Sequence, residues 1–194
     1  MREFILISNH GQTSGNFNDL MQAGRLDIVI HSIINAFFVS NNMREDTIFH
    51  LILNGPPDPP RHIEFIYDSE MPISKKDVGN LLKSVLWKYK QGKKIKAFPG
   101  IFVEKKSFQA LIKELVESGK KNFYLLDKRG KDISNMELKE NPIFILGDHE
   151  GIPKNNKTFI KRYTKEVFSL GRTNYFTSQC VTILNYLVDK NGNN

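Results

Sequence analysis

The 194-residue chain is 40% hydrophobic and 25% charged with a net charge of +7, a composition that is typical of globular proteins and excludes a disordered chain. It contains no run of ~18 apolar residues, which excludes a membrane-spanning helix. Its one cysteine, Cys180, excludes a disulfide within the chain and suits a reducing compartment, so we expect a cytoplasmic protein.

The first part of the sequence predicts three strands and one helix. Short, mostly apolar runs predict buried strands at 2–8, 47–53 and 62–67. The segment 20–40 carries apolar residues at the i, i+3, i+4, i+7 spacing of a helix. The segment 54–61 contains four prolines, which remove four backbone donors and predict an exposed loop or a rigid turn.

The remainder alternates between predicted helices and short strands. Helices are predicted at 74–91, 107–118, 158–163 and 177–189. Strands are predicted at 101–103, 123–126, 143–146 and 167–170. Ser74 is the expected N-cap of the first of these helices, and Gly119 follows the end of the second. Short apolar runs bounded by turn residues are typical of parallel sheets, so we predict one α/β domain over 1–194, with 1–71 as an elaborated N-terminal half.

Positive charge is concentrated in the middle of the chain. Residues 72–131 hold sixteen basic residues, fifteen of them lysine, and five acidic residues, whereas the rest of the chain is mildly acidic. This lysine-rich section is either a solvated face or a surface for a polyanion, of which nucleic acid is the commonest.

Three apolar runs end abruptly in small or polar residues, after Leu126, Leu146 and Leu170. In an open α/β sheet, ligands bind beyond the carboxyl ends of the strands, where such loops converge. Gly147 and Gly171 either let a ligand approach the backbone or only form tight turns. Neither a phosphate loop nor a metal motif is present, so we predict no metal. Cys180 is expected to be a small buried side chain near the ligand and not a nucleophile.

The segments 144–153 and 169–185 resemble the SPOUT methyltransferases, and the second is similar to their signature of a strand, a loop and a helix that contains Ser-Gln-Cys. The front end, with Gly24-Arg-Leu-Asp27 and the segments 35–40 and 44–46, resembles the archaeal TrmY family. Members of this family methylate N1 of pseudouridine 54 in the T-arm of tRNA with S-adenosylmethionine. The similarity runs nearly from end to end.

The resemblance implies an α/β fold with a SPOUT-type, mostly parallel sheet flanked by helices, whose C-terminal part, 120–190, forms a deep trefoil knot and binds the cofactor. It also implies a homodimer with tRNA as partner. Carried over by position, the cofactor contacts are Leu126, Gly147, Leu170, Gly171, Arg172, Thr173, Asn174, Tyr175 and Cys180. A cationic side chain should not face the sulfonium of the cofactor, so we expect Arg172 to point to RNA or to form a salt bridge.

Methylation at N1 of pseudouridine requires the loss of a proton, which a carboxylate within ~3 Å can accept. We predict Asp68 as this base, because it closes the strand at 62–67. Asp58 in the proline loop and Asp27 are the alternatives, and a turn or capping role is open for all three.

For RNA binding, Arg25 and Arg44 are candidates because the guanidinium group pairs well with phosphate. The lysines predicted to contact RNA, in a segment that begins at Trp87, are Lys88, Lys90, Lys93 and Lys94. The alternative is that Trp87 is buried and the lysines are merely solvated. Two other functions stay open, a ribose 2′-O-methyltransferase and a non-enzymatic RNA-binding or assembly factor.

Overall fold

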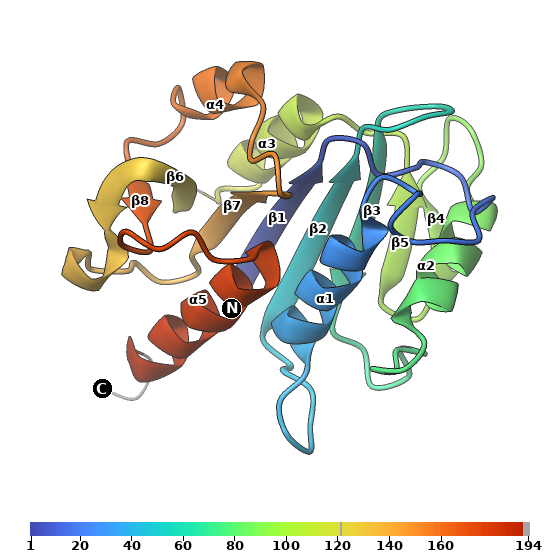
Figure 1. The fold of residues 1–194 in the computed structure, drawn as a ribbon, viewed down its shortest axis with the longest axis horizontal. Coiled ribbons are helices and arrows are strands. Elements are labelled where there is room, and N and C mark those ends of the chain that lie inside the picture. The colour runs from blue at the N-terminus through green and yellow to red at the C-terminus, as the bar shows by residue number, and fades with distance from the viewer. Residues whose placement is uncertain (121, 192–194) are drawn as a thin grey trace.

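An apolar run near the start of the chain forms the central strand of an eight-stranded sheet. All seven residues of this strand, β1 (Arg2–Ser8), are buried, and its parallel neighbours are β2 (Thr47–Leu53) and β7 (Ile143–Gly147). The computed structural model describes residues 1–120 and 122–191, and its strand order is β4-β5-β3-β2-β1-β7-β6-β8 (Figure 1). The predicted strands at 2–8 and 47–53 are confirmed with their boundaries.

The sheet is parallel on one side and antiparallel on the other. β6 (Phe123–Asp132) and β8 (Val167–Ser169) extend the parallel part beyond β7. β3 (Arg61–Ile66), β5 (Ile101–Glu104) and β4 (Ile95–Phe98) form an antiparallel part beyond β2. The expected parallel sheet is confirmed in outline. The sequence does not predict β4, because this four-residue edge strand has only one buried residue and therefore no apolar run.

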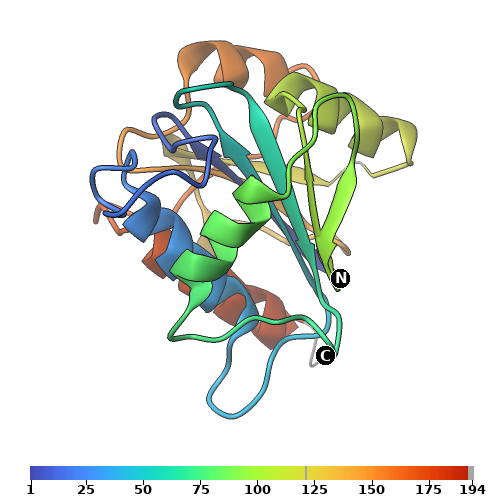
Figure 2. The ribbon, with the colours of Figure 1, turned by 90° about the vertical axis from the view of Figure 1, so that its right-hand side faces the viewer.

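Helices cover both faces of the sheet (Figure 2). One layer consists of α1 (Leu26–Phe37), α2 (Val78–Trp87) and α5 (Thr177–Asn191). The other layer consists of α3 (Phe108–Glu117) and α4 (Lys154–Ile160). A short 3-10 turn, η1 (Ile133–Asn135), follows β6. None of the helices in the described part of the chain is long and apolar enough to cross a membrane.

Each layer packs against its own hydrophobic core, because successive residues of a strand point to opposite faces. Phe4 of β1 faces the α1 layer, where its ring stacks on Phe144 of β7 at a centroid distance of 5.6 Å. Ile5 and Ile7 of the same strand face the α3 layer and share a core with Phe108. The two cores together hold the strand ends, and hence the loops that follow them, in fixed positions.

Two helix starts differ in their caps. Ser107, which was not predicted as an N-cap, caps α3, and its Oγ accepts a hydrogen bond from the Ala110 N–H at 3.2 Å. Ser74 does not cap α2, which begins at Val78. The Ser74 carbonyl instead accepts the Asp77 N–H in a turn that precedes the helix. The Ser-x-x-Asp pattern therefore marks a turn here and not the N-cap of a helix.

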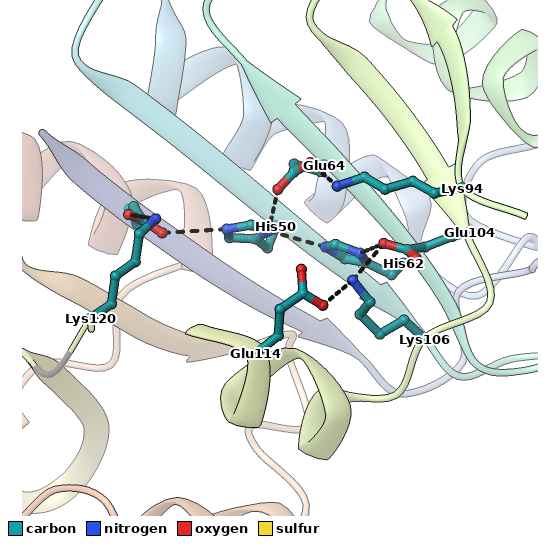
Figure 3. Close-up of polar contacts among 9 residues, drawn as sticks. His50, His62, Glu64, Lys94, Glu104, Lys106, Glu114 and Lys120 are labelled. Carbon is teal, nitrogen blue, oxygen red and sulfur yellow. Dashed lines mark hydrogen bonds and ion pairs between the residues drawn. The ribbon is translucent and has the colours of Figure 1, made fainter. Parts of the chain in front are cut away.

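A buried polar network crosses the α3 side of the sheet (Figure 3). Its centre is a pair of stacked imidazoles, His50 of β2 and His62 of β3, whose Nδ1 and Nε2 atoms lie 3.0 Å apart. The outer nitrogen of His50 lies 3.4 Å from Glu3, and the outer nitrogen of His62 lies 3.1 Å from Glu104. The pair of imidazoles therefore lies between two carboxylates, Glu3 and Glu104.

Charged residues at the rim complete this network. The ion pairs join Lys120 to Glu3, Lys94 to Glu64, and Lys106 to both Glu104 and Glu114. Glu64 also lies 3.8 Å from Nδ1 of His50. Within residues 1–120 and 122–191, these groups do not form a metal-binding cluster. The network is a balanced set of protein charges, most of them removed from solvent.

Candidate active site

The five parallel strands end at one edge of the sheet, which we call the carboxyl edge. The loops that follow β1, β2, β7 and β8 at this edge cover residues 9–25, 54–60, 148–153 and 170–176. The last of these loops carries six of the nine predicted cofactor residues, and a seventh, Gly147, is the last residue of β7. The structure therefore brings together segments that are more than a hundred residues apart in the sequence, as the strand-end argument predicts.

Asp148 joins the loop after β7 to the loop after β1. This buried carboxylate accepts the backbone N–H of Asn9 at 2.6 Å and its side-chain amide at 2.9 Å. The same amide also donates to the Gly151 carbonyl at 2.9 Å. Sequence reasoning missed Asn9. The available signal was its position directly after β1, which matches the position of Asp148 directly after β7.

Gly147 and Gly151 pack backbone against backbone in the turn after β7. A Cβ on Gly147 would lie less than 3.0 Å from the main chain of Gly151, so no larger residue fits. The Gly147 carbonyl accepts a hydrogen bond from the Thr177 hydroxyl at 2.9 Å, which connects this turn to the start of α5. The glycines form a tight turn, and that turn is also part of the loop cluster at the carboxyl edge.

Strand β8 lies between two parts of β6. Phe168 pairs with Leu126 in the first part of β6 and with Lys131 in the second part. Between Leu126 and Lys131, the chain passes close to β8 at Gly130. A Cβ on Gly130 would lie less than 3.0 Å from the Phe168 backbone. The predicted strand 123–126 is thus only the first part of β6.

A hollow of about 520 Å³ opens beside this crossing. Its lining residues are Lys128, Gly130, Asp132, Ser169, Gly171, Arg172 and Asn174. Three of them, Gly171, Arg172 and Asn174, are predicted cofactor residues. Asp132 was not predicted. Hydrogen bonds from the hydroxyl and the N–H of Ser134 lower the pKa of Asp132, so the hollow has an ionised carboxylate on its wall.

The other predicted cofactor residues are not part of the lining of this hollow. Leu126 and Leu170 are half-buried and pack against the core on the α1 side. Thr173 and Tyr175 are exposed in the loop after β8. Cys180 is buried near the start of α5, and burial raises the pKa of its thiol to about 11, so it is protonated at neutral pH. A protonated, buried thiol agrees with the expected packing role and is a poor nucleophile.

The structure does not bring Asp68 to the carboxyl edge. β3 runs antiparallel to β2, and its last residue, Ile66, pairs with Ile48 at the start of β2. Asp68 therefore lies at the opposite edge of the sheet, where its carboxylate accepts the N–H of Glu70 at 2.9 Å. This placement argues against Asp68 as a base that acts beside the cofactor loops of its own chain.

Asp58 does lie at the carboxyl edge. The proline loop that carries it is joined to the loop after β1, because the Asp58 N–H donates to Thr13 Oγ1 at 2.9 Å. The carboxylate of Asp58 is half-exposed and pairs with Arg61 at 3.1 Å and with Lys105. The hydrogen bond from Lys105, with a further one from Arg61, lowers the pKa of Asp58, so this carboxylate is ionised at neutral pH.

The predicted RNA-binding arginines both form ion pairs within the chain. Arg25 pairs with Asp27 in the first turn of α1, at 3.0 Å and 3.1 Å. Arg44 pairs with Asp189 of α5 through two hydrogen bonds of 2.7 Å and is largely buried. The acid Asp27, the third candidate base, thus pairs with Arg25, as Asp58 pairs with Arg61 and Lys105. The environment of Arg44 favours a structural role, because its pairing joins the front of the chain to its last helix.

The predicted RNA-binding lysines fall into two groups. Lys88 donates to the Ala97 carbonyl at 2.7 Å, and Lys94 pairs with Glu64 at 2.7 Å. Lys90 and Lys93 are exposed in the loop after α2 and form no ion pair within the described residues. The alternative in which Trp87 is buried is wrong, since Trp87 is 63% exposed. The interpretation that needs a buried tryptophan therefore loses its main support.

Comparison with solved structures identifies the class of fold. The crystal structure of Archaeoglobus fulgidus Nep1 bound to S-adenosylhomocysteine matches with a TM-score of 0.68, over 100% of this chain and 99% of that chain. Only 11% of the aligned residues are identical, so this likeness shows the fold alone. The molecule is an α/β protein with a fold like that of this Nep1 structure.

Comparison of sequences identifies the family. The model of the family described as "Putative SAM-dependent RNA methyltransferase" matches residues 1–193, and the chain belongs to this family. A tRNA (pseudouridine(54)-N(1))-methyltransferase of Methanocaldococcus jannaschii is 33% identical over 201 residues, which cover 98% of this chain and 97% of that protein. An enzyme of the same name from Methanococcoides burtonii is 33% identical over 199 residues, with 98% and 97% covered.

Proposed function

We propose that the protein transfers a methyl group from S-adenosylmethionine to N1 of pseudouridine 54 in the T-arm of tRNA. The observation that carries this proposal is the end-to-end similarity to enzymes of that name, 33% identical over 98% of the chain. The loops at the carboxyl edge support it, because the predicted cofactor segments meet there. A tRNA substrate also fits a cytoplasmic location.

The residues around the hollow fit S-adenosylmethionine. Gly171 leaves its main-chain groups free of a side chain, and the half-buried Leu126 and Leu170 offer apolar surface. The lining also holds the ionised carboxylate of Asp132 and the cations Lys128 and Arg172, and charges of both signs suit a ligand that carries a carboxylate as well as cationic groups. When bound, S-adenosylmethionine supplies an electrophilic methyl group on its sulfonium.

The chain itself must position the base and remove its N1 proton. Methyl transfer is a displacement at carbon, for which correct positioning supplies much of the rate. Asp58 is the acid best placed for the proton, because it is ionised, half-exposed and located at the carboxyl edge. We therefore favour Asp58 over Asp68 as the general base. The cations Arg61 and Lys105 hold its carboxylate in position.

Three structural expectations belong to the same proposal. Residues 120–190 form a trefoil knot, which the passage of β8 between two parts of β6 supports. The chain is a homodimer, which the exposed aromatic side chains Phe176 and Tyr186 of the loop after β8 and of α5 support. Residues 1–194 act as one domain, because both halves of the chain contribute strands to one sheet.

A matched pair of RNAs tests the function. The protein is incubated with S-adenosylmethionine and a T-arm stem-loop that carries either pseudouridine or uridine at position 54, and the nucleosides are identified by mass spectrometry. We expect N1-methylpseudouridine from the first RNA and no product from the second, because N1 of uridine is bonded to the ribose. A ribose 2′-O-methyltransferase would modify both RNAs, and a non-enzymatic RNA-binding protein neither.

A further inference from the structure

Trp87 is the only tryptophan in the sequence, and it is 63% exposed to solvent. It is the last residue of α2. The other residues of this helix with large apolar side chains, from Val78 to Leu86, are buried against the core. The core is therefore packed without the ring of Trp87. The exposure of such a large ring to water requires another explanation.

The loop after β1 holds the indole in place. A Cβ on Gly15 would lie 2.5 Å from Cδ1 of Trp87 and 2.5 Å from the carbonyl oxygen of Lys83, so the backbone of Gly15 contacts one edge of the ring. Because this edge is fixed, the ring is a pre-positioned surface and not a freely rotating side chain. A fixed aromatic ring loses little conformational entropy when a ligand stacks on it.

The charged residues next to Trp87 in the sequence are all basic. From Lys83 to Lys96 the sequence contains six lysines and no acidic residue. Lys83, Lys90, Lys93 and Lys96 form no ion pair within residues 1–120 and 122–191. These four lysines are therefore available to bind an anionic partner from outside the chain.

The ring also lies at the same edge of the sheet as the cofactor loops. α2 starts beyond the end of β3 and runs back to the carboxyl edge, where Gly15 of the loop after β1 contacts it. β3 is separated from β7 by β2 and β1, so three strand spacings of roughly 5 Å each separate these two strands laterally. α2 itself contacts β5, one strand further out, so Trp87 and the loop at Gly147 are separated by four strand spacings, roughly 20 Å, along one edge. A few nucleotides can span this length.

We propose that Trp87 stacks on an unpaired base of the tRNA substrate, a few nucleotides from the base that is methylated, while Lys90 and Lys93 contact the adjoining phosphates. The proposal rests on the proposed function. Aromatic rings that stack on bases beside cations that follow the backbone are a general mode of binding to single-stranded nucleic acid. The T-arm would then be held at two points, the cofactor loops and Trp87.

Charge and patch size favour RNA over other partners. Trp87 is the only exposed large hydrophobic residue between Leu53 and residue 120, whereas a docked protein or a bilayer normally covers a broader apolar patch. One ring among unpaired lysines matches one base and its phosphates. Vesicles of an anionic phospholipid serve as the competing partner in the test.

Intrinsic fluorescence tests the proposal on the unmodified protein, because all tryptophan emission comes from Trp87. Titration with the T-arm stem-loop should quench this emission with the same midpoint as binding measured from the anisotropy of labelled RNA. Binding without a change in emission would overturn the proposal and leave the proposed function intact. Quenching by anionic vesicles but not by RNA would also overturn it.

Variants measure the contribution of the ring. Trp87→Ala should weaken binding of the stem-loop by roughly 5- to 100-fold, and raise KM with little change in kcat or in the Kd for S-adenosylmethionine. Trp87→Phe should recover part of the loss. Ser84→Ala, an exposed neighbour on the same helix, is the matched control and should bind like the original protein.

Thermal unfolding of each variant separates a loss of binding from a loss of structure. If Trp87→Ala folds and binds RNA normally, the stacking proposal is wrong. If the unmodified protein neither binds the stem-loop nor methylates it, the proposed function fails as well.

Discussion

The buried network fixes the protonation of His62. Glu104 accepts an N–H from Nδ1 of His62 at 3.1 Å. Burial lowers the pKa of His62 to about 4, so His62 is neutral at pH 7. Its Nε2 is then a lone pair that can accept from the Nδ1 of His50, 3.0 Å away.

This arrangement predicts a loss of stability in acid. Unfolded His62 binds a proton near pH 6.5 but folded His62 only near 4, so its contribution is present above pH 6.5 and disappears as the pH falls toward 4. Burial opposes ionisation of Glu104, but hydrogen bonds from His62 and Lys106 lower its pKa to about 2, which extends the loss below pH 4.5. We expect the unfolding free energy in urea to fall by about 2–3 kcal/mol between pH 7.5 and 4.

Two histidine variants check the source of this loss. His62→Gln retains a donor for Glu104 and removes the titration, so its stability should depend less on pH. His31→Gln, at an exposed position of α1, should behave like the original protein. Equal pH dependence in all three proteins would assign the acid sensitivity to other groups.

The two candidate bases, Asp58 and Asp68, differ in the effect that we expect from their replacement on kcat. Asp58→Asn should lower kcat by 10²- to 10⁴-fold, the range for loss of a general base, with the Kd for S-adenosylmethionine unchanged. Asp68→Asn should keep kcat within about two-fold, because Asp68 lies at the opposite edge. Single-turnover methylation and calorimetric titration with the cofactor measure the two quantities. A collapse of activity in Asp68→Asn alone would restore the original prediction.

At the scale of elements, the sequence predicts which segments are strands better than it predicts their direction. β1 and β2 are found with their boundaries because burial on both faces produces continuous apolar runs. The antiparallel direction of β3 has no signature in its composition, and for this reason the position of Asp68 could not be foreseen. The second part of β6 contains Lys128 and Lys131, and its pairing with β8 depends on main-chain bonds and not on apolar side chains.

The crossing of β6 and β8 predicts a strict size limit at Gly130. Gly130→Ala places a methyl group against the backbone of Phe168, which cannot move aside as a flexible side chain would. We expect a loss of several kcal/mol, or failure to fold, with loss of cofactor binding. Gly92→Ala is the control, since a Cβ there meets nothing within 4 Å and only the positive φ of 74° opposes it. Thermal unfolding and cofactor titration compare the two, and equal effects would contradict the close crossing.

At the scale of the whole molecule, the unpaired lysines and the predicted cofactor loops lie at the same edge of the sheet. The free lysines of the segment after α2 and the loops around the hollow both lie at the carboxyl edge. Part of the positive charge of the chain thus lies where the proposed RNA would lie. Removal of counterions from RNA by these lysines makes binding depend on salt.

Affinity for the T-arm stem-loop should fall steeply as salt rises. The double variant Lys90→Ala/Lys93→Ala should reduce the slope of log K against log salt by about 1.4–1.8, which corresponds to two phosphate contacts. Lys113→Ala/Lys139→Ala removes the same charge from exposed positions on α3 and before β7, and should leave the slope nearly unchanged. Equal slopes for the two double variants would show that only net charge matters.

The backbone contacts at Gly15, Gly130 and Gly147 also limit how the family can evolve. Each position lacks room for a single methyl group, and each contact involves main chain that cannot be exchanged by mutation. Gly92 and Gly119 are under no such restriction, since a Cβ there meets nothing. In a family alignment we therefore expect glycine to be invariant at Gly15, Gly130 and Gly147, and to be replaced by Asn or Asp in some members at Gly92 and Gly119. Invariant glycine would then mark the places where the main chain is crowded in this fold, even among relatives that share few other residues.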